Sequence, residues 1–155
     1  MIKTLQSRHL FTLQLKLGAA RTYLIGNVPT GRRMTVPVDG GTFEGDRLRG
    51  TVLPDGADWV RFRSDGVMEI DVRTTLKTHD DALIYLSYRG YLHATPENMQ
   101  KFLRSEPQAY ENLYARTSLV FETAAPQYAW LNKVVAVANG TTNGDGPLYE
   151  VFEIT

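Results

Sequence analysis

The chain contains no cysteine among its 155 residues. This absence excludes a disulfide framework, a thiolate nucleophile and any cysteine-based metal site. The chain also lacks an excess of either charge, because 17 Lys and Arg residues balance 17 Asp and Glu residues. A chain with no net positive charge is not expected to bind nucleic acid as its main partner.

Long apolar runs and nucleotide-binding motifs are missing as well. No stretch approaches the roughly 20 apolar residues of a membrane helix, and the first residues have no signal-peptide core. We therefore expect no membrane association and a cytoplasmic location. There is no Walker-type glycine loop, no dinucleotide fingerprint and no serine in a nucleophile elbow. The histidines His9, His79 and His93 lack the spacing of a ligand set, so we expect no cofactor and no metal.

Most of the chain alternates apolar and polar residues with a period of two, which is typical of half-buried strands. Strands are predicted over 11–17, 33–38, 43–53, 59–63, 67–77, 82–90, 114–123, 128–138 and 148–154. The segment 43–53 is expected to be one strand, bent at its glycines. The segment 139–146, rich in Gly, Asn and Thr, is expected to be a loop. Thr95 as N-cap and Pro96 at the first helical position predict one short helix through Arg104.

The number of strands predicts the fold class. Nine strands or more in a chain of this length are too many for a flat open sheet, and closing the sheet removes its edges. We predict a single all-β domain over residues 1–155, a closed antiparallel β-barrel of lipocalin-like size with one short α-helix. A β-sandwich is the main alternative. A barrel of about eight strands has room inside for side chains and one small ligand.

The two faces of the predicted strands differ in composition. One face is aliphatic, as in Met68, Ile70 and Val72, and the other mixes charged and aromatic side chains with almost no lysine. The polar face fits a solvated surface. It also fits the lining of a ligand cavity, because Tyr and Trp combine contact area with a polar group and Arg binds carboxylates. The sequence alone does not decide which face points into the barrel.

The cavity interpretation assigns chemistry to the polar face. Asp71 and Arg73 lie two residues apart on it, Glu122 and Arg116 lie six residues apart on it, and tyrosines of this face can donate to an oxyanion. Burial of the glutamate in such a cavity would raise its pKa, as in many general acids. The candidate catalytic residues are Asp71, Arg73, Glu122, Arg116, Tyr85 and Tyr114. For each charged pair, a cross-strand ion pair is the structural alternative.

A second group of residues would contact the ligand without reacting with it. These candidates supply aromatic walls, an amide and further charges: Trp59, Glu69, Arg89, Tyr128, Trp130 and Asn132. Ordinary core packing is the structural alternative for the tryptophans. Asp58, at the start of a strand, fits a turn cap equally well.

Several blocks of the sequence, in order, resemble one known family. They are Gly45–Trp59 (GDRLRGTVLPDGADW), Asp65–Arg73 (DGVMEIDVR), Asp81–Tyr85, Phe121–Thr123 and Tyr128–Asn132. Together they resemble the domain-of-unknown-function family 3237, also called the uncharacterised protein family UPF0311. The resemblance implies a compact β-barrel. It implies no established activity, and no catalytic residue is carried over from it.

The leading hypothesis for function is a barrel that binds an anionic or aromatic small molecule. It would act on that compound without a cofactor, by acid–base chemistry such as isomerisation, cyclisation, elimination or decarboxylation. A non-catalytic carrier of lipocalin type is the first alternative. An oligomerising interaction module, with the aliphatic face as a subunit interface, is the second.

Overall fold

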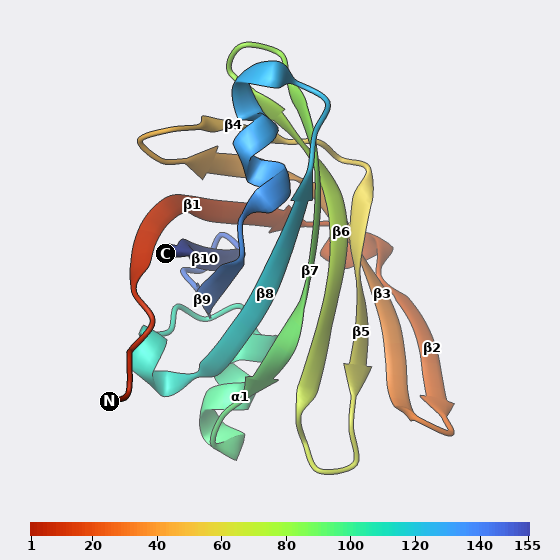
Figure 1. Ribbon diagram of the computed structural model, residues 1–155. Helices are drawn as coiled ribbons and strands as arrows, with labels where there is room; N and C mark the ends of the chain where they lie inside the picture. The colour runs from red at the N-terminus through yellow and green to blue at the C-terminus, as the bar shows by residue number, and fades with distance from the viewer.

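Ten strands form one antiparallel sheet in the computed structural model, which describes residues 1–155 (Figure 1). The strands are β1 (Ser7–Leu17), β2 (Tyr23–Val28), β3 (Gly31–Glu44), β4 (Arg49–Val52), β5 (Gly56–Phe62), β6 (Met68–Thr78), β7 (Leu83–His93), β8 (Tyr114–Glu122), β9 (Ala136–Thr142) and β10 (Pro147–Ile154). The helical segments are η1 (Ala19–Arg21), α1 (Pro96–Leu103), η2 (Tyr110–Asn112) and η3 (Pro126–Lys133). None of these helices is long and apolar enough to cross a bilayer.

Strand β1 closes the sheet, because it pairs with β10 along one edge and with β3 along the other. Leu13, for example, lies opposite Tyr149 of β10 and Phe43 of β3. Strands β4 and β5 follow one another in the space between β3 and β6. The result is a closed antiparallel barrel of eight strands with two extra strands. The predicted barrel is therefore confirmed, and the sandwich alternative is wrong.

The aliphatic face of the strands points into the barrel and forms its core, a cluster of 27 buried residues. At one end the core is filled by aromatic rings. Phe11 packs edge to face against Phe43 and Phe121, with ring centroids 5.6 and 5.9 Å apart. Tyr128 and Leu131 of η3 belong to the same core. This end of the barrel is consequently packed solid, while α1 and the β2–β3 hairpin lie toward the opposite end (Figure 1).

The short helix is confirmed. Thr95 precedes it, and its Oγ1 accepts a hydrogen bond of 3.3 Å from the backbone N–H of Asn98. Pro96 occupies the first turn, where its missing N–H is no loss. The helix ends one residue earlier than expected, at Leu103, and Arg104 is its C-cap.

Three local predictions are wrong. The segment 43–53 is not one strand, because the chain turns after Glu44 and Gly45 N–H donates to the carbonyl of Leu48. The segment 128–138 is not one strand, because Pro126 starts the helix η3, which runs into this segment. The segment 139–146 is not only a loop, because the strand β9 covers much of it. Strand β2 was not predicted, because Tyr23, Leu24 and Ile25 do not alternate with polar residues.

Loss of the Phe11 ring should destabilise the barrel strongly, because this fully buried side chain joins β1 to β3 and β8. We expect Phe11→Ala to lower the free energy of unfolding by about 3–5 kcal/mol, measured by urea denaturation. Leu83→Ala is the matched control, since Leu83 is exposed, and it should cost less than about 0.5 kcal/mol. Equal losses in the two variants would contradict this account of the core.

Candidate functional site

The polar and aromatic face of the strands lies on the outside of the barrel. Arg73, Tyr85, Arg89, Tyr114, Arg116 and Glu122 are exposed, and the aliphatic residues between them are buried. The interpretation that this face lines a cavity inside the barrel is therefore wrong. The physical reason is that closure brings one face of each barrel strand into a space without bulk water, where unpaired charges cost much more than aliphatic groups. The part these residues play in function stays a prediction.

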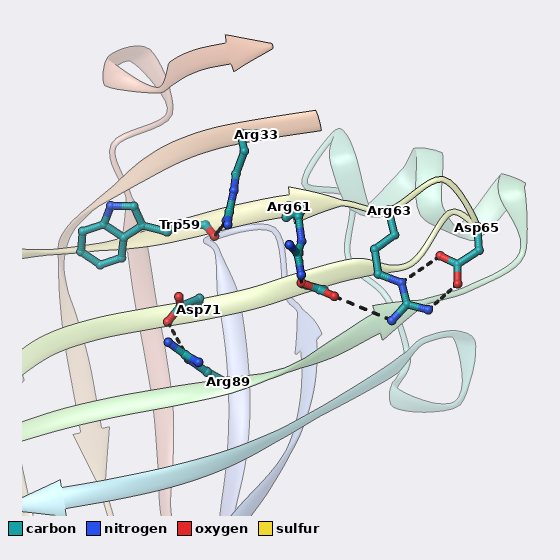
Figure 2. A network of polar contacts seen from close by, with 8 residues as sticks. Arg33, Trp59, Arg61, Arg63, Asp65, Asp71 and Arg89 are labelled. Atoms are coloured by element: carbon teal, nitrogen blue, oxygen red, sulfur yellow. Dashed lines mark hydrogen bonds and ion pairs between the residues drawn. The ribbon is translucent and has the colours of Figure 1, made fainter. Parts of the chain in front are cut away.

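On the outside, some of the predicted residues do meet. Arg89 Nε lies 3.3 Å from Asp71 Oδ1, and Arg61 Nε donates to Glu69 Oε2 at 2.7 Å. The guanidinium of Arg73 lies 4.1 Å from the centre of the Trp59 ring (Figure 2 shows Trp59, Asp71 and Arg89). These contacts are the cross-strand pairs of the structural alternative.

Other predicted partners lie apart. Glu122 is opposite Tyr85 in the sheet and makes no ion pair, while the guanidinium of Arg116 lies over the ring of Tyr114, 5.0 Å from its centre. Glu122 and Arg116 therefore form no acid–base pair.

The three candidates from 128–132 lie in η3 and hold it in place. Tyr128 donates to Asp80 at 2.8 Å, Asn132 Oδ1 accepts from Thr123 N–H at 2.8 Å, and Trp130 packs under Arg47. Hydrogen bonds from Thr78 and Tyr128 lower the pKa of the Asp80 carboxyl to about 2. These residues serve the packing of one end of the barrel.

A cavity of about 260 Å³ occupies the interior at the end near α1. Most of its lining residues are hydrophobic, and they come from the inward face of the strands and from the end of the helix. They include Met34, Val36, Val60, Phe62, Met68, Ile70, Leu92, Phe102 and Ala115. Asp58 of β5 and Tyr149 of β10 are the titratable residues of this lining that are not exposed, since Asp145 lies at the surface. Apolar walls with a few polar groups are typical of small-molecule sites.

Asp58 is held in place by an interruption of the sheet. Strands β5 and β6 pair at 57–58 with 72–73 and again at 61–62 with 68–69, but not between. In this gap the backbone N–H of Asp71 donates to Asp58 Oδ1 at 3.0 Å. The carboxyl thus takes the place of a backbone acceptor and remains turned toward the cavity, so it does not cap a turn as the sequence had allowed.

Burial in this apolar setting raises the pKa of the Asp58 carboxyl from 3.8 to about 7. The hydrogen bond from Asp71 N–H lowers that pKa, and the nearby charge of the Asp71 carboxylate raises it, but desolvation has the largest effect. A carboxyl with a pKa near neutrality is populated in both forms at physiological pH. Asp58 can therefore accept and donate a proton.

Two tyrosines lie close to this carboxyl. The rings of Tyr88 and Tyr149 meet edge to face, with centroids 5.3 Å apart. Burial, together with the nearby charge of Asp58, raises the pKa of both hydroxyls above the ordinary value, so both remain protonated donors. The Tyr88 hydroxyl is fully buried and has no hydrogen-bond partner at bonding geometry. Unpaired buried donors cost roughly 1–3 kcal/mol each, and native proteins hold few of them.

Asp58, Tyr88 and Tyr149 were not among the predicted site residues, although a signal for them exists in the sequence. Each lies in phase with the aliphatic face of its own strand: Asp58 with Val60 and Phe62, Tyr88 with Leu86, and Tyr149 with Val151. A polar group in phase with the core must be buried if the strand is regular. The phase of these three residues therefore predicts polar groups inside the barrel.

The fold and this cavity together define a small closed β-barrel with a buried carboxyl and tyrosines at one end of its interior. The chain belongs to the family described as protein of unknown function (DUF3237), whose model matches residues 5–154. It is 30% identical over 154 residues to the UPF0311 protein RPA1785 of Rhodopseudomonas palustris, and the match covers 99% of each chain. The resemblance noted in the sequence is thereby confirmed.

Solved structures agree with the fold. A β-barrel-like protein of Acinetobacter baumannii matches with a TM-score of 0.85 and 34% identity, over 100% of this chain and 99% of that one. The R. palustris protein of unknown function RPA1785 matches with a TM-score of 0.92 and 29% identity, over 99% and 100% of the two chains. A protein described as an enzyme from Penicillium herquei matches with a TM-score of 0.76 at 20% identity, over 100% and 98%, which shows a shared fold.

The raised pKa of Asp58 predicts a pH-dependent cost in stability. Below about pH 3 the carboxyl is mostly protonated in both states and contributes little. Between about pH 3 and 7 the unfolded chain loses the proton first, so the folded state becomes relatively less stable. Asp58→Asn removes this cost and keeps an acceptor for Asp71 N–H. We expect the variant to be more stable than the parent by roughly 2–4 kcal/mol at pH 8, with the difference vanishing at about pH 3. Thermal melts across this pH range measure it, and a difference that does not change with pH would contradict the assignment.

Proposed function

We propose that the barrel binds a small, mainly apolar compound bearing an oxygen function in its interior cavity and catalyses proton transfer on that compound. The observation that carries this proposal is the Asp58 carboxyl, with its pKa raised to about 7, in a cavity lined mostly by hydrophobic residues. General acids and bases work best when their pKa lies near the operating pH. Burial beside apolar side chains is the usual way to raise a carboxyl to that value.

Asp58 would act as the base in its ionised form and as the acid in its protonated form. It would remove a proton from the bound compound, and the proton it gains would return to another atom of the same compound or leave with the product. Tyr149, which lines the cavity, would donate a hydrogen bond to the oxygen on which negative charge develops. Tyr88 packs behind Tyr149 and would keep its ring in position. Isomerisation, cyclisation, elimination and decarboxylation are the reaction types that such a set of groups serves.

A ligand carrier without catalysis is the second candidate, and the mostly hydrophobic lining favours it. A carrier needs shape and apolar area, whereas an enzyme needs a titrating group that faces the ligand. The description of the P. herquei protein as an enzyme is in keeping with catalysis on this fold. The hypothesis of an oligomerising interaction module assumed that the aliphatic face forms a subunit interface. That face lies inside the barrel and is not available for such an interface.

Ligand binding in the cavity should stabilise the fold. In a thermal-shift screen of phenols, aromatic acids, keto acids and fatty acids, a compound at about 100 times its Kd should add roughly 2.7 kcal/mol of stability. Met34→Trp, at a half-buried position of the lining, should abolish the shift, because the larger ring occupies the cavity. Arg73→Ala, on the outer face, should leave the shift unchanged. The reverse result, loss in Arg73→Ala only, would place the ligand outside the barrel.

Turnover of a compound found in that screen would separate enzyme from carrier. We expect Asp58→Asn to lower kcat at least about 100-fold while binding persists, since the variant keeps the shape but loses the titrating proton. Glu122→Gln changes an exposed carboxylate on the outer face. In the same assay this variant tests Glu122, which the sequence had suggested as a catalytic residue. Loss of turnover in Glu122→Gln with full activity in Asp58→Asn would overturn the proposal, and binding without any turnover would establish a carrier.

A further inference from the structure

Half of the chain's arginines gather on one outer wall of the barrel, on β3, β5, β6, β7 and β8 or just beyond their ends. We call this surface the arginine wall, and it consists of Arg33, Arg61, Arg63, Arg73, Arg89 and Arg116. A groove of about 450 Å³ runs along it, lined by Arg33, Arg61, Arg89, Trp59 and Tyr91 among others. Figure 2 shows the first four of these side chains. No lysine lines this groove. Protein–protein contact sites are typically enriched in arginine, tryptophan and tyrosine and poor in lysine, as this groove is.

Three acidic residues neutralise only half of these arginines. Asp65 pairs with Arg63, Glu69 with Arg61, and Asp71 with Arg89 (Figure 2). The other three, Arg33, Arg73 and Arg116, have no carboxylate partner. The wall therefore carries a surplus of positive charge, although the chain as a whole has a net charge of zero.

The three arginines without a carboxylate are nevertheless held in place. Arg33 Nη1 donates to the carbonyl of Trp59 at 3.1 Å, and Arg73 lies on the Trp59 ring, 4.1 Å from its centre. Arg116 Nη1 donates to the carbonyl of Ala115 at 3.0 Å, and its guanidinium lies over the ring of Tyr114. Each guanidinium has five N–H donors, so donors remain for a partner. Their immobilisation lowers the entropy that binding would cost.

The register of the sheet sets the length of the partner. Arg33, Arg61, Glu69, Tyr91 and Arg116 are successive cross-strand partners, one from each of five neighbouring strands. Four steps between strands separate Arg33 from Arg116, about 19 Å. One small molecule cannot contact both ends. An extended polypeptide of about six residues, at roughly 3.3 Å per residue, spans the distance.

We propose that the arginine wall docks an extended segment of a partner protein that has acidic residues at its two ends and a neutral centre. The acidic ends would bind Arg33 on β3 and Arg116 on β8, and the centre would pass over β6, where Glu69 and Asp71 are already paired. A nucleic acid fits this pattern poorly, because its evenly spaced phosphates would lie against those two carboxylates. Trp59 and Tyr91 supply contact area in the middle. This inference is independent of the proposed catalytic cavity.

The test uses a fluorescein-labelled peptide with two aspartates at each end and four neutral residues between them. Its binding to the full chain is measured by fluorescence anisotropy at an ionic strength of about 50 mM, where surface charges are only partly screened. The variant Arg33→Gln/Arg73→Gln/Arg116→Gln should weaken binding at least about tenfold. The matched control Arg8→Gln/Arg21→Gln/Arg104→Gln removes the same charge from exposed arginines elsewhere, and binding should stay within about twofold. Both variants should melt within a few degrees of the parent chain, since these side chains are surface groups.

Several outcomes would overturn the proposal. They are a failure of the parent chain to bind the peptide at millimolar concentration, an equal loss in the two triple variants, and equal binding of a peptide whose four aspartates are contiguous. Tighter binding of an eight-nucleotide oligothymidylate, lost in the wall variant, would make the wall a nucleic-acid surface instead.

Discussion

The double pairing of β1, with β10 on one side and β3 on the other, is the constraint on which the rest of this structure depends. It turns a ten-stranded sheet into a closed surface, which has one inside and one outside. Every strand of the barrel must then present one face to a space that excludes bulk water, and charged groups cannot fill that space at acceptable cost. Closure thus decides the orientation of all the barrel strands at once.

The interior is not uniform along the barrel. Phe11, Phe43 and Phe121 fill one end, whereas the other end keeps a cavity with the carboxyl of Asp58 and the ring of Tyr149 in its wall. Buried polar groups without full hydrogen bonding cost roughly 1–3 kcal/mol each. The desolvated Asp58 carboxyl and the unpaired Tyr88 hydroxyl place this cost near the hollow end, whereas at the filled end the buried Tyr128 hydroxyl has its partner in Asp80.

Alternation was sufficient to predict most of the strands and the closed barrel, because regular strands with one buried face keep a strict period of two. It failed where that condition does not hold. Strand β2 is exposed on much of both faces, and η3 begins at Pro126 within a stretch whose apolar spacing also fits a strand. The proposed site was missed for a different reason. Arg73 on Trp59 and Arg116 on Tyr114 give an outer face the composition of a cavity wall, and composition cannot distinguish an aromatic that lines a ligand site from one that supports an arginine.

Asp71 makes contacts on both the outer and the inner face of the barrel. Its side chain faces outward and pairs with Arg89, while its backbone N–H holds the carboxyl of Asp58 on the inside. Because every residue except proline supplies that N–H, the outer side chain can be exchanged during evolution without loss of the inner anchor. The hydrogen bond on the inner face of β6 is therefore independent of which side chain stands at this position on its outer face.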